Sequence, residues 1–222
     1  MRITTQMLNE SARQAGLPIN RSTLLDYIKN DGATNPLLEA MNRNKENVAN
    51  TAKKSNYEKL DKEADQLTQS AQALLQNGEN SLFEQAKASG DNQKVYDSIE
   101  NLFENYNSTL KALRTTSNTM NDFYRQMLLE APAETKESLA GVGITFAKDG
   151  TATVDMEKVK ATDFATLESL FGKESDFVNK VEFLSTRISD NAEANVESLS
   201  STYNVGGNLY SAMNSSKYDF WG

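Results

Sequence analysis

Apolar residues recur at alternating spacings of four and three over residues 93–130, and this feature constrains the fold most strongly. Such spacing keeps one apolar stripe on a single helix face, and over many turns it is the heptad pattern of helices that pack side by side. It predicts one uninterrupted helix over about residues 93–130. The expected seam is Val95, Ile99, Leu102, Tyr106, Thr109, Leu113, Thr116, Met120, Phe123 and Met127.

A second long helix is predicted over residues 36–76, because Pro36 suits a first helical position and an apolar seam follows it. The seam begins at Leu37, Met41, Val48 and Ala52, weakens, and resumes at Leu60, Ala64, Leu67, Ala71 and Leu74. Residues 76–92 supply a short connection with a short helix near residues 81–87. Two long amphipathic helices joined in this way are expected to pack antiparallel.

A third long helix is expected over residues 175–201. Its apolar positions are Phe177, Val181, Leu184 and Ile188, followed on a shifted stripe by Ala192, Val196 and Leu199. A shifted stripe is expected where a helix leaves one packing partner for another.

Residues 138–172 are the one stretch where a strand pattern interrupts the helical sequence. Short β-prone runs joined by Ala-Lys-Asp-Gly predict a hairpin at about residues 143–155, in which Gly150 takes a positive φ. Asp155 is expected to cap a short helix, and Gly172 to end the next one. We expect this hairpin to brace the base of the helical rod.

The predicted fold class is therefore mainly α, an elongated antiparallel coiled-coil helical bundle with one small β-hairpin. The expected organisation is an N-terminal axial or assembly segment at residues 1–35, a coiled-coil rod at 36–202 and an aromatic tail at 203–222.

Composition argues against an enzyme. The chain has 222 residues without a Cys or a His, so thiol nucleophiles, thiolate metal sites and the commonest general base are missing. Asp149 and Asp155 lack the ligand spacing of an EF-hand, so a turn and a helix cap are expected there. We predict no catalytic, cofactor-binding or metal-binding residue and no cofactor; a Ser-Lys or carboxylate hydrolase is the least favoured alternative.

The net charge of −8 and the absence of a long basic block disfavour nucleic-acid binding. No apolar run is long enough to predict membrane insertion, and no signal-peptide pattern follows Arg2. These features indicate a cytoplasmic protein, or one exported by a route that needs no cleaved signal.

Both ends of the chain carry candidate partner-binding residues, namely Ile3, Met7 and Leu8 near the start and Tyr218, Phe220 and Trp221 near the end. The N-terminal residues lie roughly on one helical face, and the aromatic cluster is unusual for a terminus, where chains normally fray. These side chains are expected to be buried, either on the body of the protein or against neighbouring subunits.

Residues 139–159, LAGVGITFAKDGTATVDMEKV, followed by Leu170-Phe171-Gly172, resemble the C-terminal region of the flagellar filament-cap family of hook-associated proteins. Residues 99–113, with the pair Tyr106-Asn107, resemble a helix of that family. The opening MRITTQML resembles the start of flagellins and hook–filament junction proteins. The resemblance implies export without a cleaved signal through the flagellar type III channel, an extracellular location in the flagellum, and termini that form coiled coils in the assembled structure.

The resemblance further implies other flagellar axial proteins as partners, flagellin and hook-associated proteins among them, and admits a homo-oligomer. Residues 76–92 occupy the place where family members usually carry large head domains. The predicted function is thus a structural or assembly component of the bacterial flagellum that self-assembles by coiled-coil docking. The alternative is a cytoplasmic coiled-coil adaptor or flagellar export chaperone.

Overall fold

The computed structural model of the protein describes residues 10, 13, 14, 16 and 36–203, with the side chains of 36–45, 47, 80 and 201–203 left aside. The chain divides into two units, Met1–Glu46 and Asn47–Gly222. In the first unit, the described residues 10, 13 and 14 are helical, and a helix begins at Pro36. The following account concerns the second unit.

The described residues form a mainly α protein with one two-stranded antiparallel sheet, which confirms the predicted fold class. The elongated coiled-coil form stays a prediction. The elements in order are α3 (Pro36–Leu75), η1 (Gly78–Asn80), α4 (Leu82–Ser89), α5 (Gln93–Thr115), α6 (Thr119–Glu130), α7 (Lys136–Gly141), β1 (Ile144–Phe146), β2 (Ala152–Val154), α8 (Met156–Ala161), α9 (Phe164–Phe171) and α10 (Asp176–Tyr203).

Helices α3 and α5 run antiparallel, as their seams predict. Thr109 Oγ1 donates to the carbonyl of Glu63 at 3.0 Å, and Asn105 Nδ2 donates to Ser70 Oγ at 2.7 Å. Residue numbers therefore rise along one helix as they fall along the other. The second part of the α3 seam is fully buried: Leu60, Ala64, Leu67, Ala71 and Leu74 all have no exposed surface. Burial of these apolar side chains is the main force holding the pair together.

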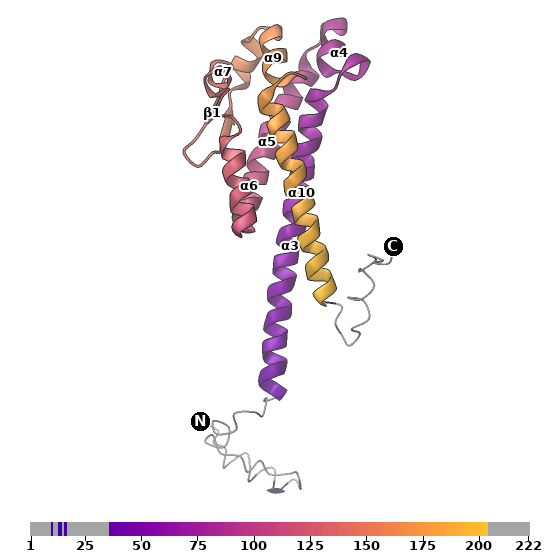
Figure 1. Cartoon of the computed structure of the whole chain (residues 1–222), viewed down its shortest axis with the longest axis vertical. Helices are drawn as coiled ribbons and strands as arrows, with labels where there is room; N and C mark the ends of the chain where they lie inside the picture. Colours follow the sequence, from indigo (N-terminus) through magenta and orange to yellow (C-terminus); the bar gives the residue numbers. More distant parts are fainter. Residues whose placement is uncertain (1–9, 11–12, 15, 17–35, 204–222) are drawn as a thin grey trace, which may run out of the picture. The chain divides into compact units, whose positions relative to one another are not determined.

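Helix α10 packs antiparallel on another side of α3 (Figure 1). Thr68 Oγ1 donates to Ser185 Oγ at 2.8 Å, and Ser189 Oγ lies 2.6 and 2.7 Å from carboxylate oxygens of Asp61 and Asp65. The predicted apolar positions of α10 are buried as far as Ala192. They are Phe177, Val181, Leu184, Ile188 and Ala192.

The prediction of one uninterrupted helix over residues 93–130 is wrong. Helix α5 ends at Thr115, and the chain reverses so that α6 lies against α5 and α10. Tyr106 Oη donates to the carbonyl of Leu128 at 3.0 Å, which fixes α6 on α5. The last seam residues, Met120, Phe123 and Met127, are exposed rather than buried, with exposed fractions of 50%, 56% and 38%.

The start of the α3 seam also differs from the prediction. Val48 is 65% exposed and Ala52 is exposed. The Tyr57 hydroxyl accepts a hydrogen bond of 2.6 Å from Asn118, just beyond the end of α5. Residues 48–56 of α3 therefore lie past the end of α5 and lack that helix as a partner.

The hairpin forms where it was predicted. Ile144 pairs with Val154 and Phe146 with Ala152, and Gly150 has a φ of 84° in the turn. A side chain of α5 pairs with the backbone of β2. Asn107 Nδ2 donates to the Ala152 carbonyl at 2.8 Å, and Asn107 Oδ1 accepts from the Ala152 amide at 2.7 Å. One side chain thus imitates a neighbouring strand and attaches the hairpin to α5.

The predicted caps are also present. Asp155 accepts from the Lys158 amide at the start of α8, and Gly172 follows the last residue of α9. Gly172 has an extended backbone with a φ of −81°, so a left-handed conformation does not explain why this residue is glycine. A Cβ at this position would lie 2.6 Å from the Glu168 carbonyl oxygen, which leaves no room for a side chain.

An aromatic cluster joins the hairpin and α9 to the long helices. The Phe103 ring of α5 lies with its centroid 6.2 Å from Phe146, 6.1 Å from Phe171 and 5.7 Å from Phe177. Helices α4 and α9 lie at one end of the bundle (Figure 1), and the ring centroids of Phe83 in α4 and Phe164 in α9 are 5.6 Å apart. Rings at these separations add specific geometry to the burial of apolar area.

Candidate docking surface

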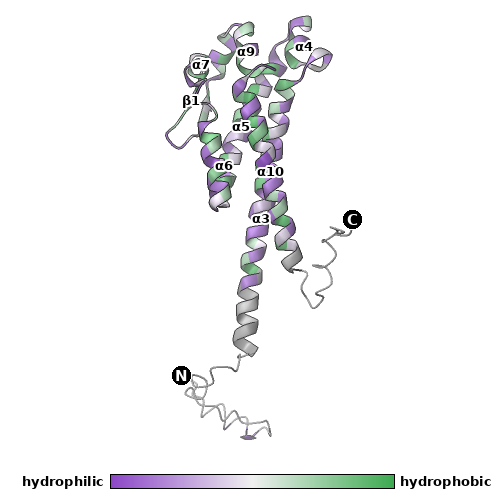
Figure 2. Ribbon diagram, viewed as in Figure 1, coloured by the Kyte–Doolittle hydropathy of each residue, from purple (hydrophilic) through white to green (hydrophobic). Residues whose placement is uncertain are grey.

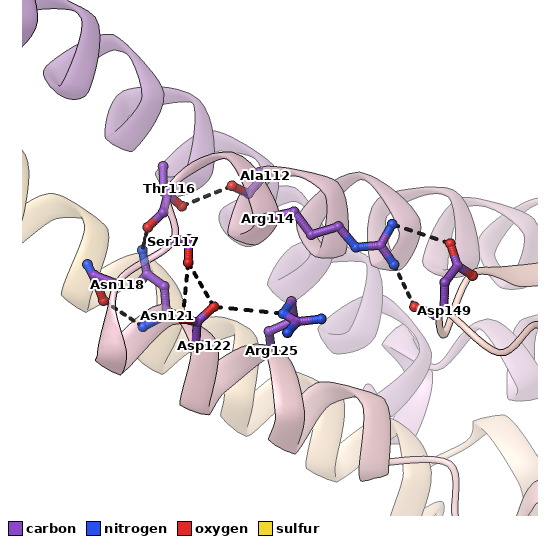
Figure 3. A network of polar contacts seen from close by, with 9 residues as sticks. All are labelled: Ala112, Arg114, Thr116, Ser117, Asn118, Asn121, Asp122, Arg125 and Asp149. Atoms are coloured by element: carbon purple, nitrogen blue, oxygen red, sulfur yellow. Dashed lines mark hydrogen bonds and ion pairs between the residues drawn. The ribbon is translucent and has the colours of Figure 1, made fainter.

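Residues 116–118 explain why α5 and α6 are separate helices. Thr116 Oγ1 turns back to the Ala112 carbonyl at 2.9 Å, while Asn118 caps α6 by accepting from the Asn121 amide at 2.8 Å (Figure 3). Ser117 Oγ contacts both carboxylate oxygens of Asp122 at 3.0 Å. Short polar side chains that bond to nearby backbone compete with helix continuation, and here they end one helix and begin the next.

Asn121 fixes the rotation of α6 about its own axis. Its side chain is fully buried, donates to the Thr116 carbonyl at 2.7 Å and accepts from Asn191 Nδ2 of α10 at 3.0 Å. Seven residues further along the same face, Leu128 is also fully buried. With this polar-and-apolar face turned inward, the neighbouring face of α6 is turned to solvent.

That outward face is apolar. Met120, Phe123 and Met127 follow one another at spacings of three and four along α6, and Phe183 of α10 is 57% exposed. Met127 and Phe183 line the same groove, which has a volume of about 460 Å³ and is completed by residues including Ala131 and Leu184. We call the surface formed by Met120, Phe123, Met127 and Phe183 the α6–α10 face.

Charged side chains border this face on both helices. Lys180 Nζ lies 3.1 Å from a Glu134 carboxylate oxygen, and both residues line the groove. Glu130 is exposed and accepts from Gln126 Nε2 at 2.6 Å. The Arg187 guanidinium lies 5.4 Å from the centre of the Phe183 ring, a cation–π contact that leaves the ring edge free. Glu130 and Glu134 line the groove on the α6 side and Lys180 on the α10 side, and the basic groups are paired within the chain, Lys180 with Glu134 and Arg187 with Asp190.

The arrangement suits protein docking. Figure 2 shows hydrophobic and hydrophilic residues interleaved along α6 and α10. Of the exposed hydrophobic residues, Met127 of α6 and Phe183 of α10 line one groove. A groove between two helices with apolar walls accepts a further helix, whose anchors would insert between the side chains of the face. Contiguous exposed apolar surface of this kind marks interaction sites.

Groups with shifted pKa values serve the fold and do not gather on this face. The backbone amide and hydroxyl of Thr151, and then Arg114, lower the pKa of Asp149 in the hairpin turn. Thr166 lowers the pKa of Asp163 at the start of α9, and burial raises the pKa of Tyr106. Asp149 accepts from the Thr151 amide in the hairpin turn, and Asp155 caps α8, as predicted.

Over the described residues, Asp and Glu side chains form no cluster of three that could hold a metal ion. In the same part of the chain, no helix has both the length and the hydropathy to cross a membrane.

The residues predicted to bind partners, Ile3, Met7, Leu8, Tyr218, Phe220 and Trp221, all lie outside the described residues. The sequence prediction missed the α6–α10 face because Met120, Phe123 and Met127 continue the heptad spacing of α5. The signal that could have revealed it is Thr-Thr-Ser-Asn at residues 115–118, a run of poor helix formers that ends in a good N-cap residue.

No match to this chain emerged among protein-family models, curated proteins or solved structures.

Proposed function

We propose that this protein is a non-enzymatic structural or assembly component of the bacterial flagellum, cap-like or hook-associated, that acts by docking helices onto neighbouring axial proteins. The observation that carries the proposal is the way residues of the cap-like pattern fold together. Residues 144–154 form a hairpin, Asp155 caps the next helix, and Tyr106-Asn107 ties both α6 and the hairpin to α5. The resembling stretches at residues 99–113 and 139–172 thus belong to one packed unit.

The proposed partners are flagellin and hook-associated proteins, reached by export without a cleaved signal. Binding would use Ile3, Met7 and Leu8 at one end of the chain and Tyr218, Phe220 and Trp221 at the other. The exposed α6–α10 face supports a docking role, since an amphipathic partner helix can cover it.

The test is mass spectrometry of flagella sheared from the source bacterium and washed. The protein should be recovered with the filaments or hook–basal structures, while an abundant cytosolic protein measured in the same fractions should not. Recovery of this protein only in the cytosol would contradict the proposal.

The alternative, a cytoplasmic adaptor or export chaperone, is favoured by one observation: the α6–α10 face offers a docking site that needs neither terminus. Deleting residues 218–222 separates the two functions. An axial component should lose assembly into flagella while its melting temperature stays unchanged. An adaptor that binds through α6 and α10 should keep its partner after the same deletion.

A further inference from the structure

We propose that Asn77 is a site of spontaneous deamidation, in which the backbone nitrogen of Gly78 attacks the Asn77 side chain and water completes the reaction. The site is independent of the flagellar assignment, because it depends only on the short connection between α3 and α4. Asn-Gly occurs once in the chain, at this position. A glycine after the asparagine leaves the attacking nitrogen without a neighbouring Cβ and gives the backbone its widest freedom to rotate.

Both reacting groups lie in open surroundings. Asn77 is exposed, and its side chain makes no capping hydrogen bond to η1. Within the part of the chain that the structure describes, the Gly78 amide has no backbone acceptor. A Cβ built on Gly78 would meet nothing within 4 Å. The ψ of Asn77 is 163°, and the open surroundings allow the rotation about this bond that carries the Gly78 nitrogen to Cγ of Asn77.

The reaction uses water as its one co-reactant. The Gly78 nitrogen loses its proton and forms a bond to Cγ of Asn77. The bond from Cγ to the side-chain nitrogen then breaks, and that nitrogen takes up a proton and leaves as ammonia. Water opens the resulting cyclic succinimide at either carbonyl. Cleavage at Cγ gives aspartate, whereas cleavage at the backbone carbonyl carbon gives isoaspartate, in which the main chain runs through the former side chain.

Two comparable sites in the chain each lack a free amide after the reacting side chain. Asp149 precedes Gly150, but the Gly150 amide donates to a backbone carbonyl at 2.9 Å, and the Asp149 carboxylate accepts from the Thr151 amide at 3.0 Å. Asn101 is exposed, but the amide of Leu102 belongs to the hydrogen-bonded turns of α5. Both sites should therefore stay unmodified under conditions in which Asn77 reacts.

Conversion of Asn77 places a negative charge where the fold does not favour one. The residue lies just beyond the end of α3, and a carboxylate at the C-terminal end of a helix is unfavourable. Glu79 lines the same open pocket as Gly78 and adds a like charge. Isoaspartate also adds a carbon atom to the backbone beside the turn in which the Ser81 amide donates to the Gly78 carbonyl at 2.9 Å. Modification therefore weakens the connection between α3 and α4.

The first test is peptide mass spectrometry of the full chain after incubation in mildly alkaline buffer. Asn77 should lose its amide and yield isoaspartate as well as aspartate, while Asn101 keeps its amide. Isoaspartate is the decisive product, because direct hydrolysis of the side chain gives aspartate alone. The proposal is overturned if Asn77 keeps its amide as long as Asn101 does, or if aspartate forms without isoaspartate.

Substitution of glycine tests the role of the attacking nitrogen. Gly78→Ala shields this nitrogen and narrows the backbone rotation, so the loss of ammonia from Asn77 should slow by about tenfold or more. Gly90→Ala is the matched control, because Gly90 has a φ of 73° against 66° for Gly78, and its surroundings are equally open. The control variant should react at the rate of the wild-type chain, and circular dichroism checks that both variants keep their helices. Equal rates in the two variants would overturn the proposal.

Discussion

Tyr106 and Asn107 are neighbours in sequence, yet each holds a different element to α5. The buried Tyr106 hydroxyl donates to the Leu128 carbonyl of α6, while Asn107 pairs with both backbone groups of Ala152 in β2. Since consecutive helical residues point in directions about 100° apart, one dipeptide can bind elements on two sides of a helix. One dipeptide thus holds both α6 and the hairpin to α5.

Replacing Asn107 by Ala should loosen the hairpin. The change leaves the amide and carbonyl of Ala152 without partners at a residue that is 5% exposed, so we expect a loss of about 1–3 kcal/mol in the free energy of unfolding. Urea unfolding measures the loss, and hydrogen exchange at the Ala152 amide should accelerate. Asn105→Ala, which removes a side-chain bond to Ser70 on another face of α5, should leave that exchange rate unchanged. Equal exchange rates in the two variants would contradict this role.

Gly150 shows that a positive φ and a close approach can be separated experimentally. A Cβ at Gly150 would lie 1.8 Å from Leu129 Cδ2, whereas Gly90 has a similar φ of 73° and open space around it. Gly90→Ala should therefore cost about 1 kcal/mol through backbone strain alone. Gly150→Ala should cost about 2–4 kcal/mol, because overpacking against α6 is added. Thermal unfolding compares the two, and equal losses would mean that Leu129 moves aside freely.

Asp149 should give the hairpin turn a dependence on pH. Hydrogen bonds from Thr151, together with Arg114, lower its pKa in the folded chain, so its contribution is present above the unfolded pKa, near 3.8. That contribution is lost as the pH falls through the lowered value. Asp149→Asn should thus melt below the wild-type chain at neutral pH, and the two melting temperatures should converge in acid. A difference that stays constant down to the lowest pH would show that the charge of Asp149 does not matter.

At the scale of elements, the sequence allowed most helices to be placed, because their apolar periodicity is long and their caps are strong. Helices α3 and α10 and the hairpin lie within a few residues of their predicted bounds. The break between α5 and α6 was not predicted, since the spacing of Thr116, Met120 and Phe123 continues the heptad pattern across it. A heptad pattern identifies one face of a helix, but it does not identify what covers that face. The buried side chain of Asn121 fixes which face of α6 points inward. Its hydrogen-bond partner Asn191 lies far away in sequence, so the sequence pattern alone could not reveal this contact.

The cap at Asn118 can be tested against a matched position. Asn118 accepts from the Asn121 amide, whereas Asn92 holds the same position before α5 without a side-chain cap, and each also donates to a tyrosine hydroxyl. Asn118→Ala should cost about 1 kcal/mol of unfolding free energy. Asn92→Ala should stay within about 0.5 kcal/mol of the wild-type chain. Urea titration of both variants checks the difference. A larger loss at Asn92 would mean that the tyrosine contacts, rather than the cap, carry the effect.

At the scale of the whole molecule, the residues that bury the core and those that offer a docking surface come from the same periodic pattern. Leu102 and Leu113 are buried by α5 packing, while Phe123 and Met127, on the same heptad positions past the break, remain outside. One reversal of the chain therefore converts part of a core seam into exposed surface. Exposed apolar surface of this kind is typical of a docking site, so the same periodic pattern supplies both the buried seam and the surface that an amphipathic partner helix can cover.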